Sequence, residues 1–295
     1  MPRLAIIEAP SNLGLMPTGV ERTPEVLLEL GLGRQLGAES VARIAAPAYD
    51  ARRDPATGML NPRSIAGYTP KLADAVEAAA GRGEVPIVLG GDCSILLGCL
   101  LALKRRGRHG LFFVDGHTDF YDPTTSISGE GADMDLSLVT GRGPALVTDL
   151  EGRRPYMRDE DTVVLGYRDA PTARKHGAKD VRDTAITAFD LAAVRAAGAG
   201  AAATVATRRL AEAPTEGFWI HLDADVLDDR VMPAVDYRQP DGLSPAELVA
   251  VLAAAIATGR VAGIDVTIYN PNLDDADLTA GRGLVDCLVR GLGAA

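Results

Sequence analysis

The residues best suited to chemistry in this chain follow an apolar run at positions 111–114. Asp115, His117 and Asp119 stand two apart directly after that run, in the sequence VDGHTDF. Carboxylate oxygens and imidazole nitrogens are common protein ligands of divalent metal ions. In an extended segment alternate side chains point the same way, so these three would face a common side. The pattern predicts a metal site; taken alone, it also fits a set of turn and capping residues.

A second segment repeats the arrangement. The run FWIHLDAD places His221, Asp223 and Asp225 two apart at the end of another apolar stretch. Cys93 follows a third stretch, in VLGGDCS. Four carboxylates gathered at an apolar edge would repel one another and lose hydration unless they were protonated or neutralised by a multivalent cation. One ion with an open position cannot use six protein ligands, whereas two bridged ions can, so a binuclear centre is the simplest interpretation.

The hydrophobic pattern indicates which elements position these residues. Short runs rich in branched aliphatic residues predict buried strands at 4–9, 41–46, 85–90, 110–115, 162–167, 218–223 and 261–266. Segments with helical spacing lie between them, at 24–36, 70–82, 93–106, 190–212, 244–259 and 277–292. Ser244, Pro245 and Glu247 predict a capping box at the start of one of these helices.

The alternation of strand and helix predicts the fold class, an α/β protein. We expect a single three-layer αβα domain over residues 1–295 with a mostly parallel central sheet. Stretches rich in Pro, Gly, Asp and Ser predict loops at 48–68, 119–143 and 224–243. In such a sheet ligands bind outside the carboxyl ends of the strands, which is where all three ligand-bearing segments lie.

The composition argues against several classes of protein. The chain has 295 residues, 47% of them hydrophobic, which is enough for a large core. It carries 40 Asp and Glu against 30 Lys and Arg and has no basic block, so we expect no nucleic acid partner. No apolar run reaches the length of about 18 residues that a membrane-spanning helix needs. Three cysteines and a start without a signal-like apolar segment predict a cytoplasmic protein with reduced thiols.

Several ordered motifs resemble those of the ureohydrolases, the family of arginase, agmatinase and formiminoglutamase. GGDCS is similar to the family's GGDHS, DGHTD to DAHxD, and HLDADVLDDRVMP to SxDxDxxDPxxxP. The likeness covers nearly the whole chain. It implies an arginase-like fold, two divalent metal ions, usually Mn²⁺, a small guanidino or amidino substrate, and a homo-oligomer, either a trimer or a hexamer.

The resemblance also implies how the ligands are shared between the two ions. One ion would be held by Cys93, Asp115, Asp119 and Asp223, and the other by Asp115, His117, Asp223 and Asp225. Two divalent ions lower the pKa of a shared water towards neutrality, and that water would attack the guanidino carbon while Asp119 passes a proton to the leaving amine. The implied reaction hydrolyses a C–N bond and releases urea or a urea analogue with an amine.

Three positions depart from the family pattern. Cys93 stands where the family has histidine. As a metal ligand, its thiolate would shift the metal preference from Mn²⁺ towards Zn²⁺, Fe²⁺ or Co²⁺. The alternative is that Cys93 is not a ligand but a small apolar residue beside an inactive site. Ile268 occupies the place of a glutamate that receives the guanidinium, and Ala132 that of a loop histidine. Isoleucine accepts no hydrogen bond, so either another carboxylate substitutes or the substrate lacks that group.

Acidic residues in the two loops that would border the site are candidate substrate-binding residues, although such residues are usually solvated. They are Glu130, Asp133, Asp135 and Asp236. His221 is a candidate proton shuttle or a support for a metal ligand, with a core histidine bonded to a backbone carbonyl as the alternative. His109 and His176 are expected at the surface.

The substitutions leave more than one function open. The chain is similar to one branch of the family, the N-hydroxyarginine hydrolase of cycloserine biosynthesis, at Cys93, at DGH, at His221 and over PAVDYRQPDG. This similarity favours an unusual guanidino substrate. One hypothesis is a binuclear metal hydrolase acting on a small guanidino, hydroxyguanidino or amidino compound. The second is a catalytically diverged ureohydrolase-like protein that binds a ligand or a partner subunit. A third keeps the enzyme but changes the bond, for instance to an amide.

Overall fold

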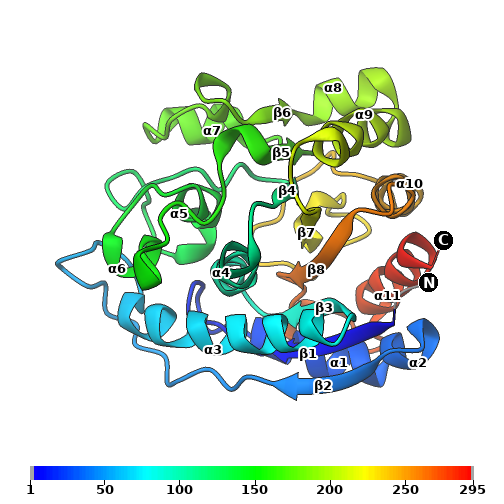
Figure 1. The fold of residues 1–295 in the computed structure, drawn as a ribbon, viewed down its shortest axis with the longest axis horizontal. Coiled ribbons are helices and arrows are strands. Elements are labelled where there is room, and N and C mark those ends of the chain that lie inside the picture. The colour runs from blue at the N-terminus through cyan, green and yellow to red at the C-terminus, as the bar shows by residue number, and fades with distance from the viewer. Residues whose placement is uncertain (1–2, 294–295) are drawn as a thin grey trace.

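The computed structural model describes residues 3–293, and its centre is one sheet of eight parallel strands (Figure 1). The strands are β1 Leu4–Ala9, β2 Glu39–Arg43, β3 Val85–Gly90, β4 Gly110–Val114, β5 Thr162–Leu165, β6 Thr187–Phe189, β7 Phe218–Asp223 and β8 Val261–Thr267. Their order across the sheet is β2-β1-β3-β8-β7-β4-β5-β6. The three strands that precede the sequence-predicted ligands, β3, β7 and β4, therefore lie in the middle of the sheet.

Helices cover both faces of this sheet. They are α1 Thr23–Glu29, α2 Leu32–Leu36, α3 Pro62–Gly81, α4 Leu96–Arg106, α5 Asp135–Val139, α6 Ala145–Thr148, α7 Ala170–Lys175, α8 Leu191–Ala197, α9 Ala199–Glu212, α10 Pro245–Ile256 and α11 Thr279–Leu292. Figure 1 shows α3 to α6 on one side of the sheet and α9, α10 and α11 on the other. None of the helices within residues 3–293 combines the length and apolarity needed to cross a bilayer.

The strands feed two separate cores because successive side chains point to opposite faces. In β4, Phe112 packs into the core under α9 to α11, and Phe113 into the core under α3 to α5. In β1, Ile6 and Ile7 divide in the same way. The predicted three-layer αβα fold class, with strands buried on both faces, is confirmed for the central strands.

Several predicted boundaries were wrong, in two cases because glycine interrupts a helical pattern. The segment 24–36 forms two helices that meet at Gly31, whose φ of 92° is left-handed. The segment 190–212 is likewise broken at Gly198. Helix α3 begins at Pro62, inside a stretch predicted as a loop, with proline in the first turn where it suits a helix. Strand β6 was missed, and the predicted strand at 41–46 runs over Glu39–Arg43 and is largely exposed.

Candidate metal centre

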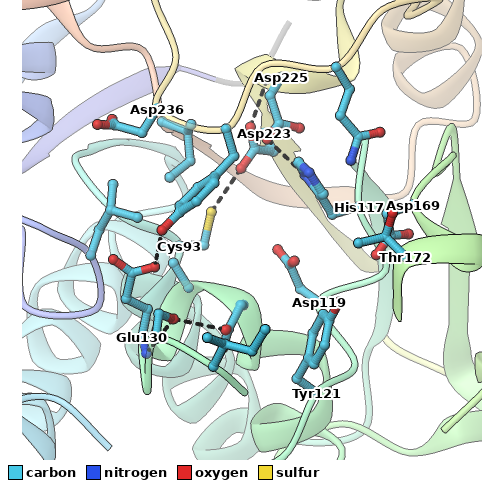
Figure 2. Close-up of a pocket in the computed structure, with 18 of the residues that line it drawn as sticks. Cys93, His117, Asp119, Tyr121, Glu130, Asp169, Thr172, Asp223, Asp225 and Asp236 are labelled. Atoms are coloured by element: carbon cyan, nitrogen blue, oxygen red, sulfur yellow. Dashed lines mark hydrogen bonds and ion pairs between the residues drawn. The ribbon is translucent and has the colours of Figure 1, made fainter. Parts of the chain in front are cut away.

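A cavity of about 610 Å³ lies at the carboxyl ends of β3, β4 and β7. Cys93, His117, Asp119, Asp223 and Asp225 all line it. In Figure 2, Cys93 and His117 point towards Asp223 and Asp225, and Asp119 faces them from a neighbouring loop. Strand register explains the convergence, because Val114 pairs with Leu222 and so brings the two aspartate-bearing segments side by side.

The donor atoms form two compact groups among the residues that the structure describes. One group is Cys93, His221 and Asp223, and the other is Asp115, His117 and Asp225. Within each group the donor atoms lie within 4.8 Å of one another. Cys93 Sγ is 3.0 Å from Asp223 Oδ2, and His117 Nδ1 is 2.9 Å from Asp225 Oδ2. Five of the six predicted ligands are therefore gathered, and His221 joins them.

Asp119 belongs to neither group, because the chain between 115 and 119 is not extended. Its φ of 42° is left-handed, and His117 N donates to Asp115 Oδ1 at 2.6 Å in a tight turn. Thr118 is held by Asp169, whose carboxylate accepts from its backbone N–H at 3.0 Å and from its hydroxyl at 3.1 Å. The extended alternation used to align the three side chains was wrong here, although Asp119 still lines the cavity.

The centre concentrates more carboxyl groups than its buried surroundings tolerate in ionised form. Burial, followed by neighbouring carboxylates, raises the pKa of Asp115, Asp119 and Asp223. Burial also acts to raise the pKa of Asp225, but His117 outweighs it, so that pKa is lowered. Burial opposes protonation of His117, yet Asp225 raises its pKa to about 9. These are the electrostatics of a site that a multivalent cation would relieve.

Two further observations test whether divalent ions fit. Asp115 Oδ2 and His221 Nε2 are buried without a hydrogen-bond partner among residues 3–293. The donor set of one thiol, two imidazoles and several carboxylates matches divalent transition metals. Burial, and then Asp223, raises the pKa of the Cys93 thiol, so metal binding must displace its proton. The residues present thus fit a pair of divalent ions.

The ring of His221 is held by Asp265, a residue that the sequence analysis did not single out. Its Nδ1 lies 2.5 Å from Asp265 Oδ2, and Trp219 Nε1 donates to Asp265 Oδ1 at 2.5 Å. The partner of His221 is thus a carboxylate and not a backbone carbonyl. Its ring stacks on Phe113, with centroids 4.6 Å apart. His221 is fully buried and is not among the described residues that line the cavity, so the structure gives the predicted proton shuttle no route to a substrate.

The acidic loop residues differ in how far they are free to receive a ligand. Glu130 is 1% exposed; its Oε1 accepts from Met16 N at 3.1 Å and its Oε2 from the Tyr237 hydroxyl at 2.7 Å. Asp133 Oδ2 accepts from two serine hydroxyls, whereas its Oδ1 is buried with no partner in the described part of the chain. Glu130 and Asp133 both line the cavity.

Asp236 and Asp135 occupy different positions from these two. Asp236 lines the cavity, but its oxygens already accept from Thr18 Oγ1 at 2.6 Å and Asn270 Nδ2 at 3.0 Å. Asp135 is completely buried at the start of α5, and its Oδ2 lies 3.7 Å from His221 Nε2. The expectation that Asp135 borders the cavity is not met among the described lining residues; it lies beneath the metal centre.

Two arginines that sequence reasoning missed hold the loops around the cavity. Arg53 donates to the carbonyl oxygens of Pro123, Ser126 and Ile127, in the loop that leads to Glu130. Arg168 donates to carbonyls of Asp225, Leu227, Gln239 and Pro240. No local sequence signal identifies either residue, because each acts on backbone atoms far away along the chain.

Gly116, the glycine of DGH, makes room for one of these arginines. A Cβ at position 116 would lie 2.4 Å from Arg168 Nη1 and 2.7 Å from Asp225 O. Both distances are shorter than real side chains show, so the guanidinium needs a glycine here. The departure from the family's alanine is thus coupled to Arg168.

The three other notable positions are also located. Ile268 is 5% exposed, lines the cavity and has a left-handed φ of 69°, which is unusual for a β-branched residue. Ala132 lines the same cavity and brings no polar side chain. The prediction that His109 lies at the surface was wrong, because it is 8% exposed at the amino end of β4.

Comparison with known proteins identifies relatives over nearly the whole chain. The family model described as "Arginase family" matches residues 3–287. An arginase from Bacillus caldovelox is 28% identical over 287 residues, covering 95% of each chain, and one from Staphylococcus aureus is 26% identical, covering 95% of this chain and 93% of that protein. The native structure of the Bacillus caldovelox arginase superposes with a TM-score of 0.87 at 26% identity over 99% of both chains. The formimidoylglutamase of Bacillus subtilis shares the fold, with a TM-score of 0.76 at 18% identity over 100% of this chain and 87% of that one.

Proposed function

The chain belongs to the arginase family of ureohydrolase enzymes, and from that premise we propose that it is a binuclear-metal-dependent hydrolase of a small guanidino, hydroxyguanidino or amidino compound. The reaction would cleave a C–N bond and release urea or a urea analogue with an amine. The single observation that carries the proposal is the pair of donor groups Cys93–His221–Asp223 and Asp115–His117–Asp225, of which Cys93, Asp223, His117 and Asp225 line one cavity. Mn²⁺ is the family's usual metal; Zn²⁺, Fe²⁺ or Co²⁺ suits the Cys93 side better.

Some residues of the site would hold the metal ions, and Asp119 would transfer a proton. When bound, two divalent ions would supply Lewis acidity and make a water nucleophilic at neutral pH. Asp119 lines the cavity outside both donor groups, so its carboxyl group is free to take a proton and deliver it to the leaving amine.

The cavity walls favour a substrate that ends in a cation. Glu130 presents a buried carboxyl group, Asp133 a half-buried one with a buried Oδ1, and Asp236 adds a third at the wall. A bound cation would compensate the desolvation of these groups, which is a stronger attraction than the same pair would have in water. We assign substrate binding to these three residues, with Tyr237 orienting Glu130 through its hydrogen bond.

The substituted positions point to an altered guanidine rather than plain arginine. Ile268 offers only an apolar surface where a guanidinium would need an acceptor, and Ala132 adds no polar group. A hydroxyguanidine places part of its polarity on a hydroxyl group and has less need of that acceptor. This chemistry agrees with the resemblance to N-hydroxyarginine hydrolases.

The test combines metal content with turnover. Protein purified without chelator is analysed for metal per chain and assayed for amine release on arginine, N-hydroxyarginine, agmatine, formiminoglutamate and simple amides. We expect about two equivalents of metal and turnover of at least one guanidine. Asp119→Asn should lower kcat by about 10²- to 10⁴-fold, the usual contribution of a proton-transfer group. Asp286→Asn, an exposed change on α11, is the matched control.

The alternative, a diverged protein that binds a ligand or partner subunit, predicts a different result. Such a protein would show no turnover on any guanidine or amide and no activity for Asp119→Asn to remove. Assembly as a trimer or hexamer and a cytoplasmic location stay predictions, which light scattering on the purified protein and fractionation of cells would check.

A further inference from the structure

The ring of His221 is oriented so that Nδ1 is hydrogen-bonded to Asp265, whereas Nε2 makes no hydrogen bond to a described residue. Trp219 Nε1 can only donate, and it occupies one oxygen of Asp265. The other oxygen of Asp265 lies 2.5 Å from His221 Nδ1 and is an acceptor for the hydrogen on that nitrogen. Nε2 then carries the lone pair. Metal-ligating histidines are held in this way, with the far nitrogen donating to a carboxylate.

The available nitrogen lies beside two other buried polar atoms that also lack a partner among the described residues. His221 Nε2 is buried and makes no hydrogen bond to any residue within 3–293. Its neighbours are Asp135 Oδ2 at 3.7 Å and Asp115 Oδ2 at 3.9 Å, and these two oxygens are also buried without partners in that range. Leaving three such atoms unsatisfied together is costly, so the arrangement indicates an absent electropositive centre.

Cys93 and Asp223 line the cavity and belong to the same donor group as His221. The donor atoms of Cys93, His221 and Asp223 lie within 4.8 Å of one another. Ligands of one tetrahedral ion with bonds of about 2.0–2.3 Å are separated by roughly 3–4 Å, so a small inward adjustment brings all three to one ion. Asp115, whose Oδ2 is 3.9 Å from His221 Nε2, belongs to the neighbouring donor group.

We propose that His221 Nε2 is a direct ligand of the ion on the Cys93 side, completing a sulfur, nitrogen and oxygen set with Cys93 Sγ and an Asp223 oxygen. The inference rests on the proposed function only in that the centre holds metal. In the family pattern a histidine stands at position 93 and would give this ion a nitrogen ligand. Here position 93 is cysteine, and His221 on β7 would supply the nitrogen ligand instead. A sulfur–imidazole–carboxylate set prefers Zn²⁺ or Co²⁺ to Mn²⁺.

The proposal also accounts for Asp119. With His221 among the ligands, the ion on the Cys93 side needs no bond from Asp119, which agrees with the place of that carboxylate outside both donor groups of the described chain. Asp119 is then free for proton transfer at the cavity. Asp265 is a positioning residue, because it fixes the ring of His221 without reaching the ion.

The test exploits the low histidine content, since the chain has only 4 histidines. The full-length protein with isotope-labelled histidine rings is loaded with two equivalents of a spin-active cadmium isotope and studied by NMR. Scalar coupling between cadmium and ring nitrogen marks each ligating imidazole directly. We expect coupling at two rings, His117 and His221. Coupling at one ring, with both ions bound, would overturn the proposal and leave His221 as a buried group between Asp265 and Asp135.

Variants identify the rings and separate the proposal from a general loss of stability. His221→Gln should remove one coupled ring and weaken the ion on the Cys93 side by at least about 10- to 100-fold, the loss that follows from removing a supporting partner alone. His109→Gln is the matched control, a buried histidine at the opposite end of the sheet, and should leave both couplings and both affinities unchanged. Cys93→Ser should keep both rings coupled and shift only the cadmium resonance.

The outcomes also distinguish this inference from the proposed function. Two bound ions, turnover and one coupled ring would refute the His221 assignment and keep the hydrolase. No bound cadmium, with no metal in the purified protein, would refute both. If His221→Gln does not fold, the number of coupled rings in the wild-type protein still decides the question.

Discussion

Asp133 is a cavity residue outside the two donor groups, and the protein alone accommodates its charge poorly. Its Oδ1 is buried without a hydrogen-bond partner among the described residues. Burial raises its pKa from 3.8 to about 7, although the hydroxyls of Ser126 and Ser128 act in the opposite direction. We therefore predict that Asp133→Asn stabilises the metal-free protein at alkaline pH, because asparagine keeps the shape of the group without the charge.

The sign and size follow from proton linkage. The folded protein holds the proton of Asp133 more tightly than the unfolded chain, so this group's contribution is fully present below about pH 4 and is lost as the pH rises to about 7. At 1.36 kcal/mol per pKa unit, the full loss is about 4 kcal/mol. Between pH 5 and pH 8 the stability difference between Asp133→Asn and wild type should therefore grow by about 3 kcal/mol.

The assay is urea unfolding of both metal-free proteins at pH 5, 6, 7 and 8. Taking the difference cancels the titration of the other buried carboxyl groups, provided that they do not couple strongly to Asp133. Asp286→Asn, in which an exposed carboxylate is neutralised, is the matched control. A flat difference for Asp133→Asn, or destabilisation that increases towards pH 8, would refute the reasoning. A cationic ligand that pairs with Asp133 should stabilise wild type more than the variant at pH 8.

Three further substitutions test the geometry of the cavity. Ile268→Gly should be more stable than Ile268→Ala by about 1 kcal/mol in urea unfolding, the reverse of the usual order, because the left-handed φ of 69° penalises any Cβ. Gly116→Ala should lower stability by about 1–3 kcal/mol in thermal unfolding, because its methyl group overlaps Arg168; an unchanged Tm would mean that the guanidinium moves aside freely. Tyr237→Phe removes the hydroxyl that holds Glu130 and should raise KM for a cationic substrate with little change in kcat, whereas an equal fall in kcat would place Glu130 in the chemical step.

The central sheet could be predicted from sequence because its strands leave a strong signal. Strands buried on both faces appear as continuous apolar runs, and β3, β4, β7 and β8 are of this kind. The capping box of Ser244 and Glu247 at the start of α10 was likewise confirmed. Strand β6 has only three half-buried residues, so it produces no such run. The alanine-rich segment around Gly198 favours helix so strongly that the break there had no visible signature.

The residues of the site were identifiable, but their pairing was not. Aspartate, histidine and cysteine at the end of a strand can be recognised as candidate metal ligands from each segment alone. The contact between His221 and Asp265 depends instead on the register of β7 against β8, in which these two residues are direct partners. The same register sets Trp219 beside Gly263, where a Cβ would lie 2.1 Å from the indole. Local patterns contain no information on the register between two strands whose paired residues are 44 positions apart in the sequence.

Three departures from the family pattern, at Cys93, Gly116 and His221, are far apart along the chain, and in the structure each lies against a residue of the candidate metal centre. Cys93 lies against Asp223, and His221, at the position of the motif's serine, joins the same donor group. Gly116 makes room for Arg168, which in turn holds the backbone of Asp225. A site that had lost its selection would be expected to lose donors one by one, with unrelated residues in their place. At these three positions the substitutions keep donor atoms or support existing ones, whereas Ile268 and Ala132 bring no polar group to the cavity wall. The contacts at the candidate metal centre therefore favour a rebuilt site over an abandoned one.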